Sequence, residues 1–222
     1  MRPVDAASLV IVRKRREVLM GLRSSRHVFV PKLYVFPGGR VDPGDARVPA
    51  PFALQGQTQE RLCHRVTPAR GRAIAMAAVR ETFEETGLQL GREISRPLRT
   101  RSLAWQPFYH LCMAPALDRM HYFARAVTPP NNVRRFDARF FLADAGDCRG
   151  ELRGNGELED LHWVSFDETA RLPMLDITRL VLSLVQNAFG HPVAVDIPRQ
   201  VRERELVEQY HLKPAQPANP SG

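Results

Sequence analysis

The sequence predicts a single α/β domain, on three observations. Residues 8–13 and 18–22 are rich in Val, Ile and Leu and flank a short basic run, as the two strands of a β-hairpin flank their turn. Residues 68–86 carry the start and stop signals of a helix. Residues 177–189 place apolar side chains at helical spacing, which predicts a final helix packed on a sheet.

The other elements follow in chain order. Residues 33–36 read as a third strand, and Pro37, Gly38 and Gly39 then predict a sharp turn that lets other groups approach the backbone. Residues 136–143 and 158–164 read as further strands. From residue 213 onward the chain is proline-rich and polar, which predicts a disordered tail at 213–222 after a domain at 1–212.

Composition favours an anionic small-molecule partner. The formal net charge is +8, and lysine occurs only at Lys14, Lys32 and Lys213, so nearly all the basic residues are arginine. Planar guanidinium groups suit phosphate-bearing ligands. Because the arginines are scattered and form no single stripe, a small phosphate compound is favoured over nucleic acid.

Cysteine usage and hydropathy bear on the compartment. Cys63, Cys112 and Cys148 are odd in number and widely spaced, so they form neither a disulfide framework nor a zinc signature. The apolar run at residues 6–12 is too short to span a bilayer, and no cleavage site follows it. We therefore expect a soluble, unprocessed cytoplasmic protein with no membrane partner; a homodimer is left open.

The helix at 68–86 carries the most informative pattern. Thr67 is a good N-cap before Pro68, and Gly87 is a good C-terminal stop. Successive residues turn by about 100°, which puts an apolar stripe on one face and three carboxylates roughly opposite, at Glu81, Glu84 and Glu85. Clustered carboxylates suit Mg²⁺ or Mn²⁺. The alternative interpretation is an ordinary solvated acidic face.

The wider string decides between these interpretations. Residues 80–88, Arg-Glu-Thr-Phe-Glu-Glu-Thr-Gly-Leu, resemble the second half of the Nudix box. In the first half, five residues separate Gly39 from Asp45, which stands where the family has Glu, and 34 residues separate Asp45 from Arg80 where the usual spacer has seven. The box is thus split by an insertion, at about residues 46–70. Since Asp is one methylene shorter than Glu, the helix glutamates are the better candidates for metal ligands.

The split box and the upstream string resemble a long-insertion branch of this family, which includes a peroxisomal coenzyme A diphosphatase. The residues that carry this likeness are Arg23, Ser24, Ser25, His27, Phe29, Pro31, Val35, Phe36, Arg135, Phe136 and Asp137. The resemblance implies an α/β/α sandwich with a mixed sheet. It also implies metal-dependent hydrolysis of a diphosphate linkage in a nucleoside diphosphate derivative, with coenzyme A or an acyl derivative as the expected substrate. ADP-ribose, NADH and nucleotide sugars stay open.

The resemblance also assigns roles to residues. Glu84 and Glu85 are the first choices for metal ligands, with Glu81 as a third ligand or the group that orients water, and Arg80 is expected to hold the carboxylates in place. Glu157, in an acidic loop, is the candidate general base, although it equally fits a polar loop residue and a helix glutamate could serve instead. Substrate contacts are expected from Gly38, Gly39, Arg23, Arg26, Arg134 and Arg135.

Two other functions stay open. A Nudix-fold ligand-binding or regulatory module without hydrolysis is the first, and the substitution at Asp45 is its main support. The second is a metal-dependent isomerase with a protonating cysteine, for which the cysteines offer no context. We further predict that the insertion lies over the cleft and shapes specificity without supplying metal ligands.

Overall fold

The computed structural model describes residues 2–25, 31–130, 132 and 134–191, so Arg26 and the expected tail lie outside the described residues. Its elements, in chain order, are β1 (Val4–Arg13), β2 (Glu17–Arg23), β3 (Tyr34–Val35), β4 (Gly38–Arg40), α1 (Gly56–Cys63), α2 (Pro68–Thr86), β5 (Gln89–Glu93), α3 (Gln106–His110), β6 (Met113–Pro115), η1 (Leu117–Arg119), β7 (His121–Val127), β8 (Phe136–Asp144), η2 (Ala145–Asp147), β9 (Cys148–Arg149), β10 (Leu158–Ser165), η3 (Glu168–Arg171) and α4 (Asp176–Ala188).

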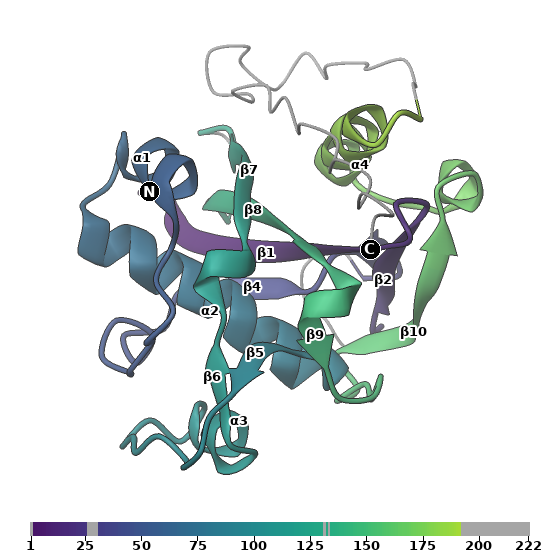
Figure 1. The fold of residues 1–222 in the computed structure, drawn as a ribbon. Helices are drawn as coiled ribbons and strands as arrows, with labels where there is room; N and C mark the ends of the chain where they lie inside the picture. Colours follow the sequence, from purple (N-terminus) through teal and green to yellow (C-terminus); the bar gives the residue numbers. More distant parts are fainter. Residues whose placement is uncertain (1, 26–30, 131, 133, 192–222) are drawn as a thin grey trace, which may run out of the picture.

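A mixed seven-stranded sheet forms the centre of the molecule (Figure 1). Its strand order is β10-β2-β1-β8-β7, with β3 paired to β2 and β4 paired to β1. β1 and β8 run parallel, whereas the other pairs are antiparallel. A second, three-stranded sheet has the order β6-β5-β9. The pairing of β4 with β1 fixes where the double glycine lies relative to the helices.

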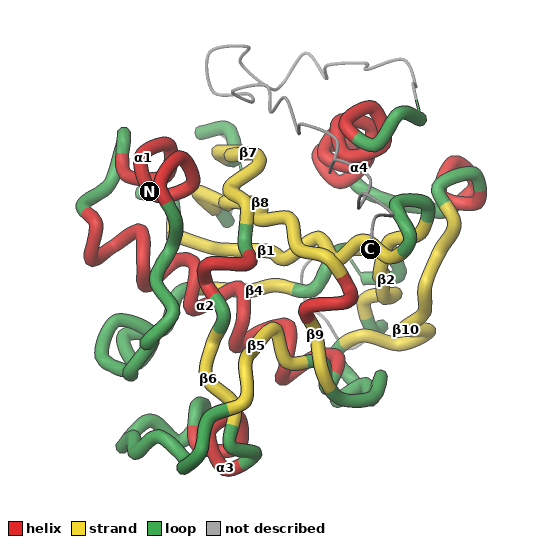
Figure 2. Tube along the Cα trace, viewed as in Figure 1, coloured by secondary structure: helices red, strands yellow, loops and turns green. Residues whose placement is uncertain are grey.

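Helices cover both faces of the large sheet, which gives two apolar cores. Along β1, Leu9 and Ile11 belong to the core formed with α2, whereas Val10 and Val12 belong to the core formed with α4. Alternate strand residues point to opposite faces, so a strand buried on both sides reads as a continuous apolar run. Figure 2 shows α2 and α4 on opposite sides of the strands. The predicted α/β/α sandwich with a mixed sheet is confirmed.

The elements with strong local signals lie where the sequence predicts them. α2 spans Pro68–Thr86; Thr67 Oγ1 accepts a hydrogen bond from the Arg70 N–H at 3.3 Å, and Gly87 ends the helix with φ 75°. The β1–β2 hairpin turns through Lys14 and Arg15, both with positive φ, as its right-handed twist favours. The two predicted later strands are each one residue longer, and the last helix begins one residue earlier.

Two features of the structure bear on the sequence-based interpretation of the insertion and of α2. The helical part of the insertion, α1, packs against the start of α2 and against β7, because Cys63 and Leu62 meet Gly71 and because Thr58 donates to Met120 O. It therefore does not cover the glutamates more than two turns further along α2. On the acidic side of α2, Glu85 is buried and Glu81 and Glu84 are half-buried, so this side is not an ordinary solvated face.

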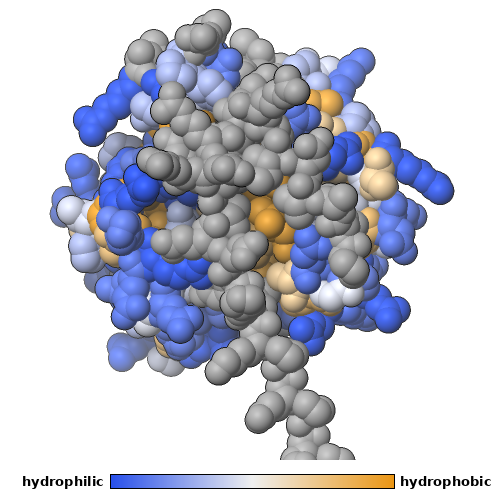
Figure 3. Space-filling model, turned by 90° about the horizontal axis from the view of Figure 1, so that it is seen from above, coloured by the Kyte–Doolittle hydropathy of each residue, from blue (hydrophilic) through white to orange (hydrophobic). Residues whose placement is uncertain are grey.

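The outer surface agrees with a chain that carries many charges. Seen from above, the described surface is mainly hydrophilic, with apolar colour in several small areas (Figure 3). Across the described ranges, no helix is both long and apolar enough to cross a membrane. The three cysteines are free, which agrees with the expectation that they form no disulfide.

Candidate active site

The double glycine brings the backbone of β4 against the glutamates of α2. The Gly38 N–H donates to Glu85 Oε2 at 2.8 Å. A Cβ atom on Gly39 would lie 2.4 Å from Glu81 Cδ, and one on Gly38 would lie 2.4 Å from Ala7 O. Real Cβ atoms do not approach backbone atoms this closely, so Gly38 cannot carry a side chain, and a side chain at Gly39 would displace the Glu81 carboxylate. The turn predicted from the sequence is therefore also the place where strand and helix carboxylates meet.

Arg80 organises this cluster with its whole guanidinium group. Its Nε donates to Asp45 Oδ1 at 2.8 Å, and its Nη2 donates to Asp45 Oδ2 at 3.1 Å and to Arg40 O at 2.9 Å. Its Nη1 donates to Glu81 Oε1 at 2.9 Å and to Glu84 Oε2 at 3.1 Å. A guanidinium has five N–H donors, and these bonds use all of them. With its side chain 7% exposed, Arg80 holds the carboxylates in one arrangement.

Asp45, the partner of Arg80, is itself held in place by further hydrogen bonds. It is fully buried, and Oδ1 also accepts from Trp105 Nε1 at 2.8 Å, while Oδ2 accepts from the Asp42 N–H at 2.8 Å. Each oxygen thus accepts two hydrogen bonds, which leaves none of its lone pairs for a metal ion. The contacts agree with the expectation that Asp45 is a poor direct ligand. Trp105 was missed in the sequence because it lies 60 residues from Asp45 in a segment without a periodic pattern.

Burial and crowding raise the pKa of all three glutamates. For Glu81 and Glu84, burial is the largest cause, and it outweighs the opposing charge and hydrogen bonds of Arg80. Burial likewise raises the pKa of Glu85 to about 8, although the Gly38 N–H opposes it. The charge of Glu157 raises the pKa of each of the three glutamates. Three ionised glutamates would outnumber the single positive charge of Arg80, so a further cation would favour their ionised forms.

The donor set fits a divalent cation. Arg80 and the Gly38 N–H each occupy one oxygen of their glutamate partners, and Glu81, Glu84 and Glu85 each keep a second oxygen that no described residue contacts through a hydrogen bond. Hard carboxylate oxygens that repel one another are the donors that Mg²⁺ and Mn²⁺ prefer, together with waters and substrate phosphates. Within the described ranges, no three His, Cys, Asp or Glu side chains are grouped so that they could hold a metal by themselves.

The remaining predicted site residues divide into two groups. Glu157 and Arg23 lie close enough to act electrostatically on Glu85, and the Ser24 N–H donates to Glu157 O at 3.0 Å, which joins the two segments. Arg134 and Arg135 lie before β8 instead, where Arg135 Nε donates to Thr128 O at 3.1 Å. The described contacts do not bring these two arginines to the glutamates.

Comparison with known proteins gives two informative relatives, while no family model matches the chain. A Caenorhabditis elegans protein named as nudix hydrolase 7 is 28% identical over 225 residues, which cover 93% of this chain. The chain spans 64% of the length of that relative. The crystal structure of a NUDIX hydrolase from Alicyclobacillus acidocaldarius matches with a TM-score of 0.63 and 25% identity, covering 89% of this chain and 99% of that one.

These two relatives agree with what the site shows independently. This chain combines three features: the sandwich fold, the double glycine packed against a helix glutamate, and an arginine that binds two of the three glutamates that follow it. The chain is thus similar in sequence and in fold to two proteins named as Nudix hydrolases.

Proposed function

We propose that this protein hydrolyses a diphosphate linkage in a nucleoside diphosphate derivative, with Mg²⁺ or Mn²⁺ as cofactor. The observation that supports this most is the glutamate cluster. The Arg80 guanidinium, whose five donors are all used, aligns Glu81 and Glu84, and the Gly38 N–H aligns Glu85. Buried carboxylates without enough positive charge cost folding free energy. Such a cost is understandable where a bound cation and a substrate complete the site.

In this proposal the helix glutamates hold the cation together with waters and substrate phosphates, and Arg80 and Gly38 keep the glutamate side chains aligned for it. The bound cation would neutralise the diphosphate and lower the pKa of a water molecule, so that hydroxide forms at neutral pH. Arg80 itself has no remaining donor for a phosphate oxygen. We therefore assign it the positioning of carboxylates and no direct contact with substrate.

Glu157 is the proposed general base. It is exposed in the loop before β10, and its charge acts on all three helix glutamates, which places it at the edge of the cluster. Its own N–H donates to Asn155 Oδ1 at 2.8 Å, which shapes the loop. An exposed carboxylate at this edge is suited to accept a proton from water and return it to solvent.

For the substrate, we propose coenzyme A or an acyl derivative, cleaved to adenosine 3′,5′-bisphosphate and a phosphopantetheine. The support is the upstream string around Arg23, whose charge acts on Glu85, so one of the expected phosphate-binding arginines lies near the cluster. Substrates with the same diphosphate but another appended group are the competitors. A cytoplasmic location is proposed with it, since three free cysteines suit a reducing compartment.

The first experiment tests hydrolysis and its residues. Formation of the two phosphomonoester products from a panel of diphosphates is measured by chromatography with Mg²⁺ and with EDTA, for the unaltered chain and for Glu84→Gln and Glu85→Gln. Each substitution should lower kcat by at least about 100-fold, equivalent to ~2.7 kcal/mol, while the fold survives. Glu151→Gln is the control, because that side chain is 84% exposed. Near-normal turnover in both variants would remove the metal role of these glutamates.

The second experiment addresses the substrate. Rates on coenzyme A, ADP-ribose, NADH and a nucleotide sugar are compared side by side at equal metal concentration. The coenzyme A rate should be the highest of the four. A rate well below any of the others refutes the choice of coenzyme A but leaves diphosphate hydrolysis intact, whereas binding without cleavage of any of the compounds indicates a ligand-binding module.

A further inference from the structure

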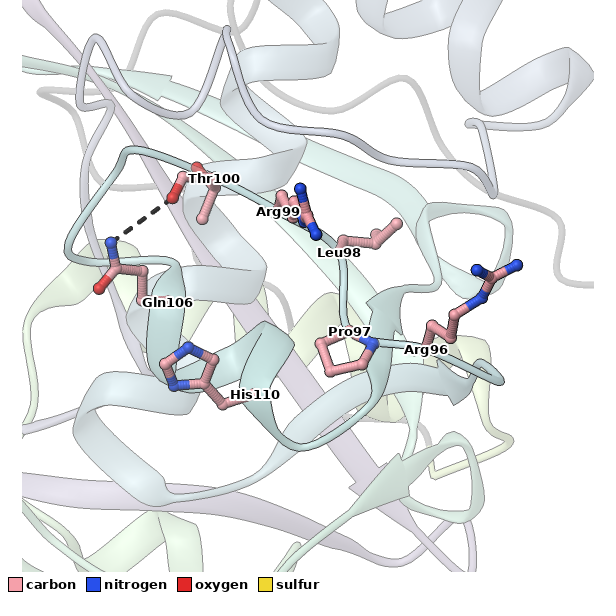
Figure 4. A pocket seen from close by; sticks show the side chains of 7 residues that line it. All are labelled: Arg96, Pro97, Leu98, Arg99, Thr100, Gln106 and His110. Carbon is pink, nitrogen blue, oxygen red and sulfur yellow. Dashed lines mark hydrogen bonds between the residues drawn. The ribbon is translucent and has the colours of Figure 1, made fainter.

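A hollow lies between the segment of residues 96–100 and α3. Its volume is about 890 Å³, which is within the usual size of a small-molecule site. Figure 4 shows Gln106 and His110 on the α3 side and the arginine-bearing segment along the other side. The residues that line it are Arg96, Pro97, Leu98, Arg99, Thr100, Gln106 and His110. None of them belongs to the glutamate cluster.

The charged residues in the segment around this hollow are all basic. Between residues 94 and 117 the sequence has no Asp or Glu, whereas it has Arg96, Arg99 and Arg101. Neither Arg96 nor Arg99 forms a hydrogen bond or ion pair with any residue within 2–25, 31–130, 132 or 134–191. Elsewhere on the molecule arginines such as Arg92 and Arg125 pair with aspartates. The hollow therefore keeps a positive potential that a ligand could neutralise.

The floor of the hollow is rigid. α3 is anchored by Trp105, Phe108 and Tyr109, which are all buried, and Tyr109 Oη donates to Pro49 O at 2.5 Å. Gln106 and His110 are four residues apart, so they lie on the same face of α3 and are held by this anchor. Gln106 Nε2 also reaches Thr100 O at 3.5 Å, which joins the two sides of the hollow. The fold thus fixes the α3 side of the hollow, whereas the side chains of Arg96, Arg99 and His110 are exposed.

We propose that this hollow binds a small organic phosphate, with the phosphate monoester held by Arg96 and Arg99. A planar guanidinium matches two phosphate oxygens at once, and two such groups without acidic partners favour a dianion. Pro97 and Leu98 give the ligand an apolar wall, so an organic group attached to the phosphate has a surface to contact. The site needs no metal ion, and it stands independently of the proposed hydrolysis.

The binding experiment uses an intrinsic probe. The chain has two tryptophans, so Trp163→Phe leaves Trp105, the residue directly before Gln106, as the single fluorophore. Inorganic phosphate, adenosine 3′,5′-bisphosphate and ATP are titrated in EDTA, which keeps metal-dependent binding at the glutamates out of the measurement. Calorimetry on the unaltered chain gives the same dissociation constants without relying on fluorescence.

The variants have a matched control. Arg96→Gln combined with Arg99→Gln should weaken binding of the organic phosphates by at least about tenfold, a loss of ~1.4 kcal/mol. Arg101→Gln combined with Arg153→Gln removes the same charge outside the hollow, where Arg153 is 80% exposed, and should leave the dissociation constant nearly unchanged. Equal losses in both double variants would show a general charge effect and overturn the site, as would the absence of saturable binding to every probe.

The source of the phosphate is tested in a further arm. Leu103 is 79% exposed in the same loop, so vesicles with and without a phosphate-monoester headgroup are compared by sedimentation. Binding of the headgroup vesicles that is lost in the Arg96 and Arg99 variant upholds the phosphate chemistry and assigns it to lipid. Binding of free organic phosphates alone assigns it to a soluble metabolite. Neither result depends on whether Glu84→Gln abolishes hydrolysis.

Discussion

Arg80 shows at the level of one residue why charge alone does not define this site. Its five donors reach three carboxylates and one backbone carbonyl, and a lysine, with three donors on a compact ammonium, cannot span them. We expect Arg80→Lys to lower kcat by about 100-fold and to cost about 3 kcal/mol of stability, because Asp45 stays buried without its bidentate partner. Steady-state kinetics and urea unfolding measure both effects. Arg153→Lys, at an exposed position, should change neither.

Trp105 acts one step further from the glutamates. Trp105→Phe keeps an aromatic ring beside Phe108 and Tyr109 but removes the N–H that Asp45 Oδ1 accepts. Losing a hydrogen bond to a buried carboxylate costs about 1–3 kcal/mol. We expect kcat to fall about tenfold with little change in KM, because Asp45 is then held less firmly and positions Arg80 and the glutamates less well.

Two comparisons separate positioning from general destabilisation for Trp105. Trp163→Phe is the matched substitution, because Trp163 lies in β10, contacts Arg13 and is not bonded to the cluster. It should leave kcat unchanged. In an Asp45→Asn background the effect of Trp105→Phe on kcat should also become smaller, because the two residues act through the same contact. Full additivity of the two effects would argue that Trp105 contributes only to packing.

At the scale of elements, the end of α2 depends on a residue without a side chain. Gly87 has φ 75°, and a Cβ atom there would lie 2.6 Å from Glu151 O. Gly87→Ala should therefore lower the free energy of unfolding by at least about 1–2 kcal/mol. Gly56→Ala is the control, because Gly56 opens α1 and a Cβ atom there would meet nothing within 4 Å. Its stability should be unchanged or slightly higher, and equal losses at both positions would contradict this account.

The elements that the sequence predicts are those with signals close by in the chain. α2 has an N-cap, a first-turn proline and a terminal glycine, and the β1–β2 hairpin has strand-forming residues on both sides of its turn. β6 has three residues and α3 has five, and their conformation depends on distant contacts. The helix glutamates were found from their shared helix face, and the family resemblance then favoured a metal-binding role for them. The bond from Trp105 to Asp45 has no local signal, because only the folded chain brings residues 60 positions apart together.

At the scale of the whole molecule, Asp5 joins three elements. From β1 its carboxylate accepts hydrogen bonds from Arg70 of α2 and Arg139 of β8, and Arg139 is 3% exposed. Burial alone would raise the pKa of Asp5, but the bonds from Arg70 and Arg139 lower it below 3.8. A carboxyl group with a lowered pKa stabilises the folded state above its unfolded pKa, and this contribution is lost as the pH falls through the folded value.

Asp5→Asn tests this linkage. At pH 7 the substitution should lower the free energy of unfolding by about 1–3 kcal/mol, because Arg139 loses a charged partner. As the pH falls below about 3.8, Asp5 binds a proton in the unfolded chain while it stays ionised in the folded chain, so the difference between the two proteins should shrink. Urea unfolding at pH values from 7 to 3 measures it. A difference that stays constant across this range would show that the charge of Asp5 is not what matters.

The split between the two halves of the Nudix box has a consequence for the entropy of the chain. The bond between Asp45 and Arg80 closes a loop that contains 34 residues, where the family spacer has seven. Because closure cost grows only with the logarithm of length, the longer loop adds about 1.4 kcal/mol. The core formed with α2 includes three buried side chains of that loop, those of Val48, Leu54 and Leu62. Burial of each contributes about 1.5–3 kcal/mol to the free energy of unfolding. Burial of the extra segment thus offsets the entropic cost of closing the longer loop. Shortening the segment would lose more stability from burial than it would gain from the smaller closure cost.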